Sequence, residues 1–194
     1  MSDDRTLAAE QALADLQAAT AGAGTIVAGI SAGQWDRPTP CTGVDVRGLV
    51  NHLVAGNLSF VSLVAGTPRP DGEADLLGAQ PVEAFRAACA SLLTALRTPG
   101  MLDRTYPLPF GQVPGLGLID IRLTEHLGHG WDLARATGQL APFPADLAER
   151  GLAVARRQLE NRPAGARSPF GAAVQVAPDA PAIDRLAGFL GRAV

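Results

Sequence analysis

Apolar residues recur at helical spacing along several long segments of this 194-residue chain. The clearest segment runs from about residue 46 to residue 64, and Asp45 before it suits a helix N-cap. Its apolar stripe consists of Val46, Leu49, Val50, Leu53, Val54, Leu58, Val61 and Val64. A stripe this broad predicts a helix that must bury one face against other helices.

The same periodicity and the end signals of helices predict five further helices. They span about residues 4–30, 81–97, 118–137, 145–160 and 184–192. Stretches rich in proline and glycine separate them, and we expect a long loop over residues 99–117 that holds at most a short extended pair. In the loop over residues 161–181, AAVQV could form a short strand. The predicted fold is all-α: one domain over residues 1–194, built on a four-helix bundle with additional short helices.

Charge and cysteine usage exclude several classes of protein. The net charge is −3 and no basic run occurs, so we expect no nucleic-acid partner. The N-terminus is acidic and polar, unlike a signal peptide, and the most apolar segment, residues 49–65, is too polar for a good membrane span. Cys41 and Cys89 form no CxxC pair, and we expect both to be small buried core residues of a cytoplasmic protein.

The stretch EHLGHGWD, residues 125–132, contains two of the three histidines. On a helix, Arg122, Glu125, His129 and Asp132 fall on one line. Glu125 and His129 are four residues apart and His129 and Asp132 three apart, so each pair can touch. His126 points about 100° away from Glu125 and is expected to be structural or to support a ligand.

Two interpretations of this polar line remain open from the helix alone. A polar line opposite an apolar stripe is usually a solvated face with weak ion pairs. However, Leu118, Ile121 and Leu133 flank the line, which indicates a helix buried in the bundle. A buried row of acidic residues and histidine must be paired or must hold a metal.

His52 favours the metal. It lies in the helix over residues 46–64 between Gly48 and Gly56, and each glycine costs about 1 kcal/mol relative to alanine inside a helix. That cost indicates close packing at these positions or free space above the histidine. With Glu125 and His129, His52 would complete a set of two imidazoles and one carboxylate.

Such a set suits Zn²⁺ and leaves a coordination position open for water or substrate. It could also hold Fe²⁺, Mn²⁺ or Ni²⁺, because nitrogen and oxygen ligands discriminate poorly among these ions. Asp132 could orient the His129 ring or act as a catalytic base.

Two segments, PTPCTGVDVRGLVNHLVAGN and LTEHLGHGWDLARATGQ, resemble the signature regions of the DinB-like metal-binding superfamily. More narrowly, they resemble the branch related to the N-terminal domain of mycothiol-dependent maleylpyruvate isomerase, which includes uncharacterised actinobacterial metal-binding proteins. The likeness extends to PFG at residues 109–111 and to the closing DAPAIDRLAGFLGR.

The resemblance implies a four-helix bundle with a divalent metal, usually zinc, held by His52, Glu125 and His129. It implies a role for Asp132 in catalysis, mycothiol or a similar small-molecule thiol as co-substrate, and an electrophilic small-molecule substrate. Arg122 could bind a carboxylate of the bound molecules or pair with Glu125. The full isomerase has a second, C-terminal domain that contributes to its site, and we expect no room for one here, so maleylpyruvate itself is not the predicted substrate.

The predicted function is therefore a metal-dependent thiol S-transferase or isomerase, acting as a monomer or homodimer. The alternatives are hydrolysis by a metal-bound water and a non-catalytic metal-binding or stress-response module. The space around the metal distinguishes them, because a structural site is closed by protein ligands and a catalytic site opens to a cavity. We expect that cavity under residues 101–117 and beside Gly48 and Gly56.

Overall fold

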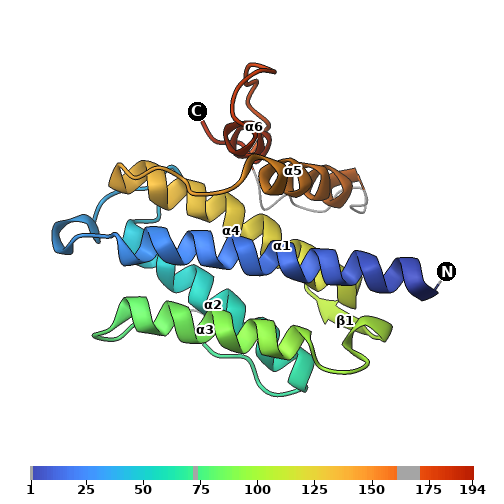
Figure 1. The fold of residues 1–194 in the computed structure, drawn as a ribbon. Coiled ribbons are helices and arrows are strands. Elements are labelled where there is room, and N and C mark those ends of the chain that lie inside the picture. The colour runs from blue at the N-terminus through green and yellow to red at the C-terminus, as the bar shows by residue number, and fades with distance from the viewer. Residues whose placement is uncertain (1, 72–73, 161–170) are drawn as a thin grey trace.

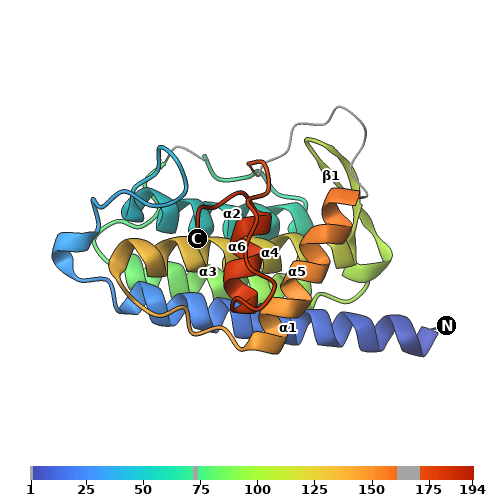
Figure 2. The same cartoon turned by 90° about the horizontal axis from the view of Figure 1, so that it is seen from above.

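Four long helices form a bundle, as expected (Figure 1). The computed structural model describes residues 2–71, 74–160 and 171–194. The bundle consists of α1 (Ser2–Ala28), α2 (Val46–Ala65), α3 (Pro81–Leu96) and α4 (Gly115–Thr137). Two further helices, α5 (Ala145–Glu160) and α6 (Ala182–Phe189), pack against each other and against α4 (Figure 2). Short 3₁₀ helices, Ala32–Gln34 and Met101–Asp103, lie in the connections. The predicted all-α fold is confirmed.

The predicted loop over residues 99–117 is largely ordered structure. Strands β1 (Thr105–Leu108) and β2 (Gly111–Pro114) form an antiparallel hairpin, and α4 begins at Gly115 rather than at residue 118. Gly115 packs directly on the backbone of Met101 and leaves no room there for a β-carbon. The glycine that suggested a loop is therefore needed for close packing.

Three other boundaries differ from the sequence prediction. Helix α1 spans Ser2–Ala28 rather than residues 4–30, and Gly22 within it makes room for the ring of Phe143. The segment over residues 172–176 is not a strand, although the Val174 amide donates a hydrogen bond of 2.8 Å to the Gly188 carbonyl. Helix α6 starts at Ala182 and ends at Phe189, two or three residues earlier than predicted at each end.

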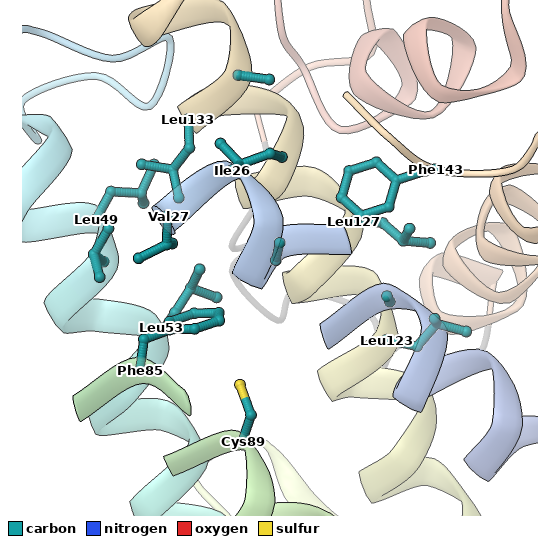
Figure 3. Packing of buried hydrophobic residues seen from close by; sticks show 14 of the residues in the cluster. Ile26, Val27, Leu49, Leu53, Phe85, Cys89, Leu123, Leu127, Leu133 and Phe143 are labelled. Atoms are coloured by element: carbon teal, nitrogen blue, oxygen red, sulfur yellow. The ribbon is translucent and has the colours of Figure 1, made fainter. Parts of the chain in front are cut away.

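The main core lies where α1, α2, α3 and α4 face one another (Figure 3). The labelled side chains meet from all four helices and include Ile26, Leu53, Phe85 and Leu127. By length and composition alone, α2 could cross a membrane, and it is the one such helix among the described residues. Much of its apolar stripe is buried in this core.

Helix α4 is the most enclosed element, because the bundle covers one side and α5 and α6 cover the other. Its buried residues include Arg122, His126, His129 and Asp132. The interpretation of the polar line as a solvated face is therefore wrong. These polar side chains are held inside the protein and need internal partners.

Candidate metal centre

His52 of α2 and Glu125 and His129 of α4 converge on one point. The Glu125 Oε2 atom lies 3.1 Å from His52 Nε2 and 3.3 Å from His129 Nε2. The two imidazole centroids are 5.1 Å apart with their planes at 85°. One potential ligand atom from each residue lies within 4.8 Å of the others.

The chemistry and spacing of this donor set suit a divalent metal such as zinc. Zinc binds histidine nitrogen and carboxylate oxygen at about 2.0–2.1 Å, which places neighbouring ligand atoms about 3.3 Å apart. The two nitrogen–oxygen separations, 3.1 and 3.3 Å, are close to that spacing. Three such ligands would leave the fourth position to a molecule from outside the protein.

A cavity of about 540 Å³ opens onto the three residues. The connection before α2 supplies one wall, and the last residues of the described chain, including Leu190 and Arg192, supply another. The exposed fractions of the side chains are 55% for His52 and 17% for Glu125. A metal held here could therefore be reached from solvent on the His52 side.

The two glycines that flank His52 have different surroundings. Gly48 lines the cavity, as expected for space beside the histidine. Gly56 does not line it, and a β-carbon at Gly56 would lie 2.6 Å from the Nη1 atom of Arg122. The expectation that residues 101–117 cover the cavity is wrong, because residues 40–44 and the C-terminal segment line it instead.

The hydrogen bonds around Glu125 keep it anionic. Burial alone would raise its pKa, but the hydrogen bonds from His129 and His52 outweigh burial and hold the pKa well below its ordinary value. For His129, burial would lower the pKa, and the hydrogen bonds with Asp132 and Glu125 raise it instead. A carboxylate that stays ionised is the form that binds a cation.

Asp132 orients the His129 ring. It is fully buried, and its Oδ2 atom lies 3.0 Å from His129 Nδ1, which is the ring nitrogen that does not face Glu125. When Nδ1–H donates to this carboxylate, Nε2 is the ring nitrogen left to face Glu125 and His52, where it can donate to Glu125 or, once deprotonated, bind a metal. Asp132 thus influences the candidate ligand set by fixing the orientation of the His129 ring.

Arg192 is a site residue that sequence reasoning missed. Its guanidinium donates to both oxygens of Asp132, from Nε to Oδ1 at 3.2 Å and from Nη2 to Oδ2 at 2.8 Å. It lies in a C-terminal segment that carries no local signal of a site. The only indication was that GFLGR belongs to a stretch resembling the DinB-like proteins.

A family model of the mycothiol maleylpyruvate isomerase N-terminal domain matches residues 16–134. The chain belongs to this family. The matched segment contains His52, Glu125, His129 and Asp132, whereas Arg192 lies beyond it.

Two similar relatives of this family member are uncharacterised proteins of Mycobacterium tuberculosis, one from strain CDC 1551 / Oshkosh and one from strain ATCC 25618 / H37Rv. Each is 36% identical over 169 residues, which cover 87% of this chain and 91% of the relative. No solved structure matches the chain.

In this member of the family, Arg122 lies behind the ligand set rather than in the cavity. Its Nε and Nη2 atoms donate to Asn57 Oδ1 at 3.2 and 2.9 Å, and its guanidinium lies over the Phe60 ring. Within the described part of the chain it forms no ion pair with Glu125, although the two charges act on each other's pKa. Among the described residues, hydrogen bonds to Asn57 therefore take the place of the ion pair with Glu125, and Arg122 does not line the cavity.

His126 stays outside the ligand set, as expected. It is fully buried, and its Nε2 atom lies 3.0 Å from Asn57 Oδ1, the oxygen that also accepts from Arg122. Burial lowers the pKa of His126 well below its ordinary value, so the ring is neutral. Asn57, which drew no functional prediction from the sequence, is the centre of this buried polar cluster.

The two cysteines have different environments. Cys89 is buried, as predicted, whereas Cys41 is only partly buried and lines the cavity. The prediction of a core residue is therefore wrong for Cys41. Its sulfur lies within 4.8 Å of potential ligand atoms of His129 and Asp132.

Proposed function

We propose that this protein binds a divalent metal, most suitably zinc, through His52, Glu125 and His129. We further propose that it uses mycothiol or another low-molecular-weight thiol to act on an electrophilic small molecule in the cytoplasm. The reaction would be S-transfer or thiol-assisted isomerisation. Residues 1–194 would work as one domain, because Arg192 near one end lines the same cavity as His52.

The observation that carries this proposal is the open side of the ligand set. A His₂–carboxylate set closed on all sides by protein would favour a non-catalytic, structural metal. Here the set faces a cavity of about 540 Å³, and more than half of the His52 side chain is exposed. A cavity of this size is within the usual range for small-molecule binding sites.

Metal coordination would supply the deprotonation of a bound thiol, and the thiolate is the reactive nucleophile. The protein's own residues would prepare the site. Glu125 contributes a permanent negative charge, Asp132 fixes the ring of His129, and the walls near Cys41 limit the space for the electrophile. In S-transfer by addition, the thiol sulfur forms a bond to one carbon of an activated double bond, the π bond breaks, and the proton lost by the thiol is returned to the neighbouring carbon.

Elemental analysis of protein purified without a histidine tag tests the metal. We expect about one zinc per chain in the wild type, and no zinc in His52→Ala or His129→Ala. His126→Gln is the matched control, because it removes the remaining histidine without touching the ligand set. A wild type that takes up no divalent metal after reconstitution would refute the proposal.

Cobalt substitution tests the thiol. We expect mycothiol to add a sulfur-to-cobalt charge-transfer band to the spectrum of Co²⁺-loaded protein, followed by conjugation of a model electrophile. A cobalt site that binds no thiol but hydrolyses activated esters would instead support hydrolysis by a metal-bound water.

A further inference from the structure

The C-terminal end of α6 has a backbone conformation that directs Arg192 into the protein. Gly191 adopts a positive φ of 87°, its amide donates to the Gly188 carbonyl, and the Arg192 amide donates to the Ala187 carbonyl, both at 3.0 Å. These two bonds are the Schellman motif, which commonly ends helices at a glycine. The residue after that glycine usually makes an apolar contact with the helix, but here it is an arginine.

The Arg192 side chain is held at three points. Its Nη1 atom donates to the Leu190 carbonyl at 2.8 Å, and the rest of the guanidinium engages both oxygens of Asp132. Only 9% of the residue is exposed. Such a two-pronged arginine–carboxylate pair fixes direction as well as distance, which a single hydrogen bond does not.

We propose that Arg192 is a positioning residue of the metal centre, acting through Asp132 on the His129 ring. This inference rests on the proposed metal function and adds a residue beyond the segment that the family model matches. Asp132 meets the Nδ1 atom of His129 with the same Oδ2 atom that Arg192 binds. Because both oxygens of Asp132 are held by Arg192, the carboxylate cannot turn away, and His129 keeps Nε2 directed at Glu125 and His52.

The position of Arg192 depends on how the residues at the C-terminal end of α6 pack. Gly128, in the middle of EHLGHGWD, lets Leu190 approach α4, since a β-carbon there would lie 2.8 Å from Leu190 Cδ1. Gly191 in turn packs on Gly171, and a β-carbon at Gly191 would lie 2.7 Å from the Gly171 Cα atom. A side chain at position 191 would therefore displace Arg192 without changing any charge.

The first test needs no metal. With three histidines in the chain, the imidazole N–H protons can be assigned by single substitutions in NMR spectra. We expect the His129 Nδ1–H signal to be protected from exchange in the wild type and lost or broadened in Arg192→Leu and Gly191→Ala. Arg192→Lys should restore it in part, because lysine keeps the charge but not the two-pronged geometry.

Arg185→Leu is the matched control, since Arg185 lies on α6, the helix that precedes Arg192, but pairs with Glu149 of α5, away from the cavity. It should leave the signal unchanged. If the signal persists in Arg192→Leu, or if Arg185→Leu removes it equally, Arg192 does not position His129 and the inference is overturned.

The second test measures zinc affinity by competition with a chelating dye. Loss of a residue that orients a ligand typically lowers metal affinity about 10–100-fold, and we expect Arg192→Leu to fall in that range. In an Asp132→Asn background the same substitution should have little further effect, because Arg192 acts through Asp132. An equal loss in both backgrounds would show that Arg192 acts by another route.

The two proposals can fail separately. A wild type with a protected His129 signal that depends on Arg192, but with no zinc binding, would refute the metal function and leave the positioning contact standing. Zinc binding that Arg192→Leu does not alter, together with an unaltered signal, would refute the positioning role alone.

Discussion

Gly56 of α2 lies directly against the guanidinium of Arg122, where a β-carbon would be 2.6 Å from Nη1 and 3.1 Å from Cζ. The buried guanidinium cannot move far, because Asn57 and the Leu53 carbonyl hold it. We expect Gly56→Ala to lower the free energy of unfolding by about 1–3 kcal/mol, the usual range for overpacking. This loss should exceed the gain in helix propensity, which is about 1 kcal/mol.

Gly24 of α1 provides the opposite case. A β-carbon there would meet only the Phe85 ring at 3.8 Å, an ordinary contact. Gly24→Ala should therefore stabilise the protein by up to about 1 kcal/mol. Urea denaturation of both variants checks the pair, and a stabilised Gly56→Ala would show that Arg122 has room to shift.

Asn57 should be costly to replace. Its Oδ1 atom accepts from Arg122 and His126, and its Nδ2 atom donates to Cys89 Sγ at 3.4 Å. Asn57→Leu leaves a buried cation without its main acceptor, and we expect a loss of about 3 kcal/mol or more in unfolding free energy.

Asn51→Leu, also on α2, is the control for that substitution. The Asn51 side chain is only partly buried and binds backbone groups of Ala74 and Leu76. Its loss should cost about 1 kcal/mol. Similar losses for the two variants in urea denaturation would contradict a special role for the buried cluster.

The two cysteines should react with iodoacetamide at very different rates. Burial raises the pKa of Cys89 to about 12, so the native protein presents almost no thiolate there at pH 8. Burial, with the charge of Asp132, also raises the pKa of Cys41, but Cys41 lines the cavity. Labelling should occur at Cys41, more slowly than for a free cysteine, and its rate should rise with pH as the thiolate fraction increases.

Peptide mass mapping of the labelled protein checks this prediction. Cys41→Ser should abolish labelling of the native protein, whereas Cys89→Ala should leave the rate unchanged. Labelling of native protein at Cys89 would indicate that α3 opens readily.

Asp120 offers a stability test as a function of pH. Burial raises its pKa, and Arg157 at 3.9 Å only partly opposes this effect. With the folded pKa above the unfolded value, the contribution of Asp120 to stability is present at low pH and is lost as pH rises through the folded pKa. Asp120→Asn should therefore be more stable than the wild type at pH 7, and this advantage should vanish below about pH 4.

Thermal unfolding at several pH values measures that difference. Asp146→Asn is the control, because its hydrogen bond with Arg150 lowers the pKa of Asp146, so the substitution should not stabilise the protein at pH 7. A constant difference between Asp120→Asn and the wild type across this range would contradict the assignment.

The helices were predictable because their periodicity is local, and the pairing of Glu125 with His129 follows from helical spacing alone. That α4 is buried could also be inferred, since apolar residues flank its polar line on both sides. The approach of His52 to Glu125 across two helices was an inference from residue types and flanking glycines, supported by a family resemblance.

Other features depend on contacts that no local pattern records. Arg192 meets Asp132 only because α6 packs on α4, and 60 residues separate them in the chain. Gly115 suggested a loop, whereas it is needed where Met101 comes very close. For Gly56 the sequence left close packing and free space open, and the structure shows close packing against Arg122. Sequence spacing shows which residues share a helix face, but not which distant side chain fills the space beside it.

The three candidate ligands differ in exposure, so they should detach from a bound metal ion in a defined order. Glu125 and His129 stand on α4, which is packed on both sides, and His129 is further fixed by Asp132. His52 faces solvent and, among the described residues, its side chain makes one hydrogen bond, to Glu125, beside an edge-on contact with the His129 ring. A chelator would therefore detach His52 first, leaving a half-site on α4 from which the metal could be recaptured or passed on.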